Sequence, residues 1–286
     1  MNKEKAALLS IFSNTCLIIF KIIAGILMGS VSVISEAIHS SIDLLASFIA
    51  FFSIKKASEA EDDEHPFGHG KYENVSGFVE ALLILLAAAL IIYEAVKRMF
   101  EGGPVENIGA GMFVMLLAAL VNFIISRILL RIAKKTDSIA LEADAMHLLT
   151  DVYTSLGVFI GLVLLKLTKI PIIDPITAIL VAILIVKASI DLIKKSLIDL
   201  VDSKLPDDDI AKILSILDSH SQITRYHSLR TRRSGPTREI DVQVHVNENT
   251  SLVDAHRLCD KIEEEIKSIF PGESYVMIHP EPENTN

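Results

Sequence analysis

Cysteine is scarce in this sequence and tryptophan is absent: the 286 residues include only two cysteines, Cys16 and Cys259. Two cysteines without a CxxC spacing cannot form a disulfide framework or a thiolate zinc cluster. Positive charge is also in deficit, because 27 lysines and arginines face 36 aspartates and glutamates, giving a formal net charge of −9. A general nucleic-acid-binding protein carries a basic face, so this balance argues against that class. Any metal chemistry must therefore use histidines and carboxylates.

What the sequence has in abundance is apolar residues in long runs. Hydrophobic residues make up 51% of the chain, and the mean hydropathy of +0.46 is high for a soluble protein. A run of about 18 or more apolar residues can cross a hydrocarbon layer of about 30 Å as a helix. The first run has no cleavage-like site after it, so we interpret it as a retained span and not as a signal peptide. Six spans are predicted, at residues 7–29, 31–54, 77–99, 108–133, 138–167 and 173–200.

The basic residues predict how these spans are oriented. Most lysines and arginines near the spans fall at the N-terminus, after the second span, after the fourth and at the end of the sixth. All of these positions lie on one side of the predicted bundle, and positive charge stays on the cytoplasmic side. We therefore expect a multi-pass protein of the cell membrane with both termini in the cytoplasm.

After residue 202 the pattern becomes that of a soluble domain. The segment LPDDDIAKILSILDSH has helical periodicity, and YHSLRTR and EIDVQVHV alternate like two strands around the turn RSGPT. A second helix follows, with Ser251 as its cap, and SYVMIHPE is a last strand. The predicted fold class is an α-helical membrane protein: a six-helix transmembrane domain (1–202, with a cytoplasmic loop at 55–76) followed by a small α+β (α-β-β-α-β) cytoplasmic domain (203–286). Both of its helices should cover one face of the sheet.

Two polar motifs interrupt the apolar spans, EAIHSSID in the second and DAMHLLTD in the fifth. His39 and Asp43 are four residues apart, as are His147 and Asp151, so each pair shares one helix face. Together they would offer two imidazole nitrogens and two carboxylate oxygens, a set suited to tetrahedral Zn²⁺. Each pair could instead be a hydrogen bond between helices. Two motifs of identical spacing favour an ion path.

Other polar residues inside the spans are less clearly assigned. Glu36 and Asp144 each precede a motif histidine by three residues. They could support the ligands, line an entrance, or simply be solvated at a helix end. Lys21, Glu80 and Asn122 also lie within predicted spans, and the pattern does not show which of them line the path.

The six spans, the two His-x-x-x-Asp motifs, the loop HPFGHGKYE and the tail segment HSLRTRRSGPTR together resemble the cation diffusion facilitators. The resemblance covers nearly the whole chain. It implies a homodimeric exporter that moves divalent metal out of the cytoplasm in exchange for protons, by alternating access in the lipid bilayer. It also implies a ferredoxin-like or metallochaperone-like tail that dimerises and binds metal.

The resemblance assigns the four motif residues, His39, Asp43, His147 and Asp151, to the transport site. A histidine as the first ligand is similar to the zinc-preferring subgroup of the family. Zn²⁺ is therefore the expected ion. Cd²⁺, Mn²⁺, Fe²⁺, Co²⁺ and Ni²⁺ remain open, because the affinity order of these metals does not by itself set selectivity.

The loop between the second and third spans matches a second metal site of the family, with Asp62, His65 and His69 as ligands. The alternative for these residues is a solvated run of charge. Lys71 matches a lysine that pairs with an acid at the start of the tail, here Asp202, so that spans and tail are interlocked. The alternative is an ordinary exposed lysine.

In the tail, His227, His256 and His279 match metal ligands of the family, and Glu281 stands where an aspartate is frequent. This sequence departs from the pattern at Gln243, which occupies a strand position that holds histidine in the family. His245 lies two residues further on the same strand face. Either His245 substitutes for the missing ligand or the tail site is weaker. His220 matches no family residue.

Three rival functions give different expectations. An intramembrane metalloprotease would carry His-Glu-x-x-His, which this sequence lacks. Catalytic zinc also keeps an open coordination position, whereas four protein ligands close the site. The chain is therefore not expected to be an enzyme. A membrane metal sensor would bind metal without flux, and a channel would conduct without a proton gradient.

Overall fold

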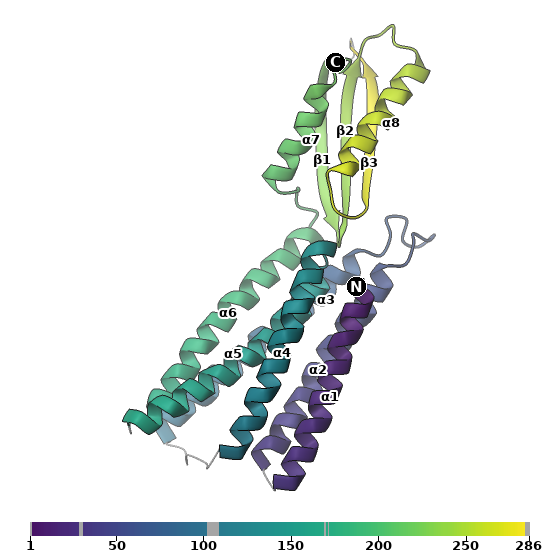
Figure 1. Cartoon of the computed structure of the whole chain (residues 1–286). Coiled ribbons are helices and arrows are strands. Elements are labelled where there is room, and N and C mark those ends of the chain that lie inside the picture. Colours follow the sequence, from purple (N-terminus) through teal and green to yellow (C-terminus); the bar gives the residue numbers. More distant parts are fainter. Residues whose placement is uncertain (1, 29–30, 102–108, 169, 171, 284–286) are drawn as a thin grey trace.

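The computed structural model describes residues 2–28, 31–101, 109–168, 170 and 172–283, which form a helical bundle and a small α/β domain (Figure 1). Helices occur at each of the six predicted segments, in the predicted order. Their bounds are α1 Lys3–Met28, α2 Val31–Ala57, α3 Lys71–Glu101, α4 Gly109–Thr136, α5 Ile139–Thr168 and α6 Ile173–Leu200. The largest difference is at α3, which begins at Lys71 and not at residue 77. Its first turns contain polar residues, which are helical although they do not belong to the apolar run that predicted the span.

Four of these helices are apolar and long enough to cross a membrane within the described residues: Lys3–Leu27, Lys71–Lys97, Phe113–Thr136 and Pro175–Leu200. The prediction of six spans is therefore supported for α1, α3, α4 and α6 and is not confirmed for α2 and α5. Several side chains of these two helices lie outside the described residues. With 27 and 30 residues, they are about 40 and 45 Å long at about 1.5 Å per residue.

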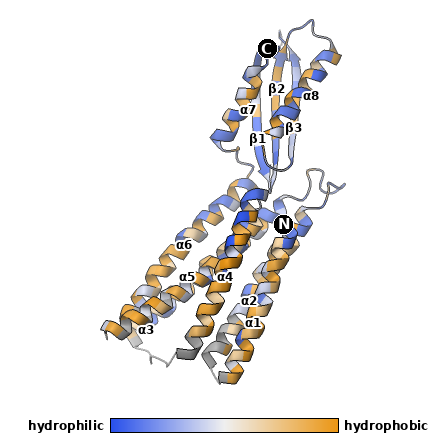
Figure 2. Ribbon diagram, viewed as in Figure 1, coloured by the Kyte–Doolittle hydropathy of each residue, from blue (hydrophilic) through white to orange (hydrophobic). Residues whose placement is uncertain are grey.

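Many small residues lie inside the bundle beside larger ones such as Leu129, and large apolar residues cover its outside. Fully buried positions include Ala6, Ala50 and Ala88, whereas Phe12 and Phe113 are more than two-thirds exposed. Small residues allow helices to approach closely, and an apolar exterior suits contact with lipid. Figure 2 shows this apolar colouring along the bundle and the more hydrophilic tail. The main helix pairs are α3 with α6, α4 with α5, and α1 with α2.

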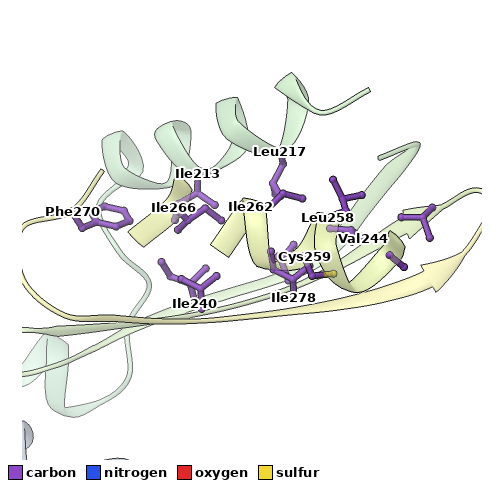
Figure 3. Packing of buried hydrophobic residues seen from close by; sticks show 14 of the residues in the cluster. Ile213, Leu217, Ile240, Val244, Leu258, Cys259, Ile262, Ile266, Phe270 and Ile278 are labelled. Carbon is purple, nitrogen blue, oxygen red and sulfur yellow. The ribbon is translucent and has the colours of Figure 1, made fainter. Parts of the chain in front are cut away.

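The tail has the predicted order, α7 Asp207–Ser219, β1 Arg225–Ser234, β2 Thr237–Val246, α8 Leu252–Ser268 and β3 Ser274–Pro282. The sheet order is β1-β2-β3, with β1 antiparallel and β3 parallel to β2. Both helices cover one face, where Ile213 of α7 and Ile262 of α8 pack over Ile240 and Ile278 of the sheet (Figure 3). The predicted cap is confirmed, since the Ser251 side chain accepts from the amide of Asp254.

The turn between β1 and β2 docks on the end of the bundle, which we call the tail side. The amide of Gly235 donates to Asn74 Oδ1 over 2.9 Å, and Asn74 Nδ2 donates to Asp199 Oδ2 of α6 over 3.1 Å. Gly235 has φ +60°, and a Cβ there would lie 2.3 Å from the carbonyl oxygen of Gly70. Because Asn74 is fully buried, its amide links α3, α6 and the tail in a closed contact.

A second contact of this turn region reaches the α4–α5 connection. Arg238 Nη2 of β2 donates to Asp137 Oδ2 over 2.6 Å, and its guanidinium lies 4.8 Å from the ring centre of Phe270. Arg238 is buried. We call the contacts of Gly235 and Arg238 with the bundle the junction.

Candidate metal centres

Asp43 of α2 and His147 and Asp151 of α5 converge inside the bundle. Each offers one ligand atom, and these atoms all lie within 4.8 Å of one another. His147 Nε2 is 3.1 Å from Asp43 Oδ1, and Asn122 of α4 donates to Asp151 Oδ2 over 3.3 Å. Asp43 and His147 are each only 8% exposed. Two helices therefore bring an imidazole and two carboxylates to one point, which we call the bundle cluster.

The fourth predicted ligand, His39, lies in α2, but its side chain is outside the described residues, as is that of Glu36. A hydrogen bond between helices would account for Asp43 and His147. It would not explain why Asp151 converges on the same point. Three convergent donors instead match the number of protein ligands in an open zinc site.

The loop residues Asp62, His65 and His69 form a second group within 4.8 Å. Asp62 Oδ1 lies 3.1 Å from His65 Nδ1, and Asp62 Oδ2 lies 3.3 Å from His69 Nε2. The amide of His65 donates to Asp62, which holds the pKa of that carboxyl below its usual range. Both ring nitrogens of His69 are buried without a hydrogen-bond partner in the described structure. Buried nitrogens in this state, beside a carboxylate, fit a metal ion.

The loop also touches the tail. Arg232 of β1 lies over the ring of Phe67, 4.9 Å from its centre, and the Tyr275 hydroxyl of β3 donates to Glu61. That hydrogen bond raises the pKa of Tyr275 to about 12. Between loop and sheet lies a cavity of about 240 Å³, lined in part by His65 and by Arg232. The loop group is therefore built against the tail sheet.

Lys71 and Asp202 meet at the same border. Lys71 Nζ donates to Asp202 Oδ1 over 2.8 Å, and Arg232 Nη1 lies 3.5 Å from the other carboxylate oxygen. The neighbouring lysine lowers the pKa of Asp202. Both side chains are more than one-third exposed, so solvent screens this pair and its contribution to stability is small.

The tail holds a third group, formed by His227, His245 and Glu281 within 4.8 Å. Glu281 Oε2 is 3.4 Å from His227 Nε2 and 3.6 Å from His245 Nε2. His279 is more peripheral: it is 65% exposed in its side chain, and its Nε2 lies 3.8 Å from Glu281 Oε1. These side chains stand on the face of the sheet that α7 and α8 leave uncovered.

Strand register explains how His245 stands relative to Gln243. His227, Gln243 and His279 pair across the sheet in one row, while Arg225, His245 and Glu281 pair in the next. Among the two β2 side chains, it is His245 that joins the group. Its Nδ1 lies 3.2 Å from the carbonyl oxygen of Pro282 and its Nε2 lies 3.1 Å from Arg225 Nη2. This assigns the proton to Nδ1, so the Nε2 lone pair accepts from Arg225 and would bind a metal ion in place of that hydrogen bond.

Two tail histidines lie apart from this group. His256 is on α8, across the sheet, with a side chain that is 74% exposed and 3.5 Å from Asp260. His220 ends α7, and its Nδ1 is 3.0 Å from the carbonyl oxygen of Ile216. One chain alone therefore gathers His227, His245 and Glu281 but not His256.

The sequence of this chain matches known proteins over nearly its whole length. Residues 7–201 match the cation efflux transmembrane domain, and residues 205–283 match the cytoplasmic domain of cation efflux proteins. An uncharacterized transporter of Synechocystis is 34% identical over 277 residues, covering 96% of this chain and 89% of that protein. The cation-efflux pump FieF of Salmonella paratyphi A is 30% identical over 279 residues, covering 98% and 92%.

A solved structure similar to the tail is the metal-bound C-terminal domain of the CzcD transporter from Thermotoga maritima. It is 29% identical and covers 27% of this chain and 91% of that one, but its TM-score of 0.26 is too low to support an argument about fold. The two domain matches confirm the resemblance predicted from the motifs, and a family of transporters agrees with the expectation that the chain is not an enzyme. The chain belongs to the cation diffusion facilitator family of cation efflux proteins.

Proposed function

We propose that this protein exports divalent metal from the cytoplasm across the cell membrane, with Zn²⁺ as substrate and protons moving inward in exchange. The observation that carries the proposal is the convergence of Asp43, His147 and Asp151 from α2 and α5 within 4.8 Å. Ionisable groups inside an apolar bundle are costly, and they usually mark an ion path. The relatives named as cation-efflux pumps support the direction of transport.

The proposed architecture has six spans in residues 1–202 and a cytoplasmic domain in residues 203–286. The lengths of α2 and α5 are sufficient for spanning. Their polar side chains Asp43, Ser47, Asp144 and His147 contact one another across the two helices. The N-terminus lies at the tail side of the bundle (Figure 1). An even number of spans with both termini in the cytoplasm agrees with this placement.

The exchange with protons follows from the chemistry of the ligands. A metal ion binds only neutral imidazole and ionised carboxylate, so binding releases protons. Histidine gains and loses its proton in the physiological pH range, so protons and metal ions compete for it there. His147 would bind Zn²⁺ arriving from the cytoplasm and take a proton on the far side, which weakens its hold on the metal. Two arrangements of the bundle, each open to one side, would convert this competition into antiport.

The donor types support zinc, since imidazole and carboxylate together suit its tetrahedral preference. The same donors accept Cd²⁺, Mn²⁺, Fe²⁺, Co²⁺ and Ni²⁺, so a member of the family that prefers manganese, iron or cadmium is the alternative. His39 is the proposed fourth ligand.

Resident metal ions are proposed for the loop and tail groups. The loop ion would be held by Asp62, His65 and His69, and the tail ion by His227, His245 and Glu281. A bound ion would supply positive charge that neutralises the carboxylate and links its ligands. The loop ion would thereby fix the local conformation near the border between bundle and tail, and the tail ion would fix the end of the sheet away from the bundle.

The proposed assembly is a homodimer joined through the tails. His256 and His279, both exposed in one chain, remain available to a metal site completed by a second copy. Metal binding between two tails would draw the protomers together and regulate transport. Lys71 and Asp202 would interlock spans and tail.

The test is zinc flux into reconstituted vesicles that have an acidic interior and the tail on the outside. Asp151→Asn should abolish uptake, because it removes one of three convergent donors. The matched control is Asp191→Asn, which removes an exposed carboxylate of α6 outside the bundle cluster. Uptake equal to the unmodified protein in Asp151→Asn would refute the site.

Two further outcomes separate the rival functions. Zinc binding without any uptake would support a membrane metal sensor. Uptake that persists after an ionophore collapses the proton gradient would support a channel. The proposal predicts that the ionophore stops accumulation and that the purified protein still binds zinc.

A further inference from the structure

A second polar cluster lies about one helical turn from the bundle cluster, toward the tail side. Ser47 follows Asp43 by four residues on α2, and Asp144 precedes His147 by three on α5. Ser47 Oγ donates to Asp144 Oδ1 over 2.9 Å. Two residues of α1 also reach Ser47. Asn14 Nδ2 donates to Ser47 Oγ over 2.9 Å, and Ser10 Oγ lies 3.2 Å from Ser47 Oγ. Three helices thus bring polar groups to one buried point.

The carboxylate of Asp144 is incompletely satisfied. Its side chain is 0% exposed, and Oδ2 has no hydrogen-bond partner in the described structure. Burial of an ionised carboxylate without a full set of partners costs several kcal/mol. A buried polar atom without a partner in a native structure calls for a physical explanation, and a bound ion is one such explanation.

Glu80 of α3 adds a second buried carboxyl group in the same condition. It is also 0% exposed, Ser76 donates to its Oε1 over 3.2 Å, and Oε2 is without a hydrogen-bond partner among the described residues. Asp144 and Glu80 are close enough to interact electrostatically. Two negative charges that repel one another in an apolar interior are both stabilised by one divalent cation.

The cation donors at this point are oxygens: the hydroxyls of Ser10 and Ser47 and the carboxylate of Asp144, while Asn14 turns its Nδ2 toward Ser47. Oxygen donors suit hard cations that keep part of their water shell, whereas imidazole nitrogen suits zinc after it has lost water. The two clusters therefore differ in the hydration state of the ion that they would accept.

We propose that Asp144, with Ser10, Asn14 and Ser47 and with Glu80 for charge balance, forms an entry site for a partly hydrated divalent cation on its way to the bundle cluster. The exposed fraction of the ionisable residues rises along α5, from Asp144, which is fully buried, through His147 to Asp151, which is partly exposed. In this conformation the hydrogen bonds of the entry site close the tail side. In the opposite arrangement the same oxygens bind the incoming ion.

The inference rests on the proposed transport function, so the test must separate the two sites. The background is the full-length protein with the loop and tail ligands replaced (His65→Ala, His69→Ala, His227→Ala and His245→Ala). The probe is Mn²⁺ alone, because manganese favours oxygen donors and its free and bound forms are counted by electron paramagnetic resonance. The expected count in this background is two ions per protomer.

Asp144→Asn should remove one Mn²⁺ and leave the other, whereas Asp151→Asn should remove only the other. Ser47→Ala should weaken Mn²⁺ binding at the entry site by about tenfold, because it removes the group that orients the carboxylate. The matched control is Ser126→Ala, since Ser126 is buried in the same bundle but donates to the carbonyl oxygen of Ala145. Ser126→Ala should leave the binding of both Mn²⁺ ions unchanged.

A single Mn²⁺ that is lost in Asp151→Asn and retained in Asp144→Asn would overturn the entry site and leave the transport site intact. Loss of flux in Asp144→Asn without a second bound ion would also overturn it, and would indicate that Asp144 serves transport without binding an ion. Loss of an ion only in Asp144→Asn would support the entry site and contradict the proposed transport site.

Discussion

Gly235 is the position where a single added methyl group should separate the tail from the bundle. Gly235→Ala places a Cβ 2.3 Å from the carbonyl oxygen of Gly70, a distance that side-chain motion cannot relieve because the neighbour is backbone. To avoid this clash the β1–β2 turn must move away from α3. The hydrogen bond from Gly235 to Asn74 is then lost.

The size of the effect has two parts. Alanine at φ +60° is strained by about 1–2 kcal/mol wherever it occurs. The hydrogen bond to the buried Asn74 Oδ1 stabilises the docked turn by about 1–3 kcal/mol, and Gly235→Ala cannot gain this contact without the clash. Each 1.4 kcal/mol is about a factor of ten. The population of the undocked turn should therefore rise by about 5- to 150-fold beyond the effect of backbone strain.

Gly272→Ala is the matched control, because Gly272 has φ +85° but a Cβ there would approach no atom closer than 4.0 Å. It introduces similar strain without a clash. The assay is amide hydrogen exchange of a peptide covering residues 233–237 in the full-length protein, which reports local opening. Faster exchange in Gly235→Ala than in Gly272→Ala is expected. Equal exchange in both variants would refute the docked turn.

Three further predictions concern the tail and loop. Arg225→Gln removes a positive charge beside the tail group. The zinc affinity of that group should rise about fivefold, because about 1 kcal/mol of screened repulsion is removed. Weaker zinc binding in isothermal titration would contradict this. Tyr275 should ionise near pH 12, above its ordinary pKa of 10, because Glu61 accepts its proton in a hydrogen bond. That contact is thus fully present below pH 10 and lost as pH rises through 12, and ultraviolet titration of Glu61→Gln should show the Tyr275 transition restored toward 10. His69→Ala should lower the zinc content of the purified protein by one loop ion while His220→Ala leaves it unchanged, as counted by mass spectrometry; equal zinc contents would refute the loop site.

Helix positions and motif partners could be predicted from the sequence because both depend on short-range patterns. Apolar runs located the helices of the bundle, and the spacing of His147 and Asp151 placed them on one helix face. The tail order followed from alternation and a capping serine. These features depend on residues within a few positions of one another, where periodicity is informative.

The junction could not be predicted, because it depends on distances between residues far apart in the chain. Asn74 is one polar residue in the segment KYENVSG, and nothing in that segment indicates that its amide joins Asp199 to Gly235. The same holds for Ser47, whose contact with Asp144 spans 97 positions. The i, i+4 spacing of Asp43 and Ser47 was a signal that a search of the sequence could have used.

The tail group shows an intermediate case. Alternation placed His245 and Gln243 on the same face of one strand, but it could not say which of them meets Glu281. Pairing of β2 with β3 decides this, since His245 lies opposite Glu281 and Gln243 lies opposite His279. The isolation of His256 likewise depends on α8 crossing the other face of the sheet.

The central claim is that α2 and α5 bring their ligands to a single ion, and zinc-edge anomalous diffraction from the full-length protein crystallised with Zn²⁺ tests it most directly. The account predicts an anomalous peak inside the bundle, about 2.0–2.2 Å from His147 Nε2 and from carboxylate oxygens of Asp43 and Asp151. Peaks at the loop and tail groups with none between these three side chains would contradict it.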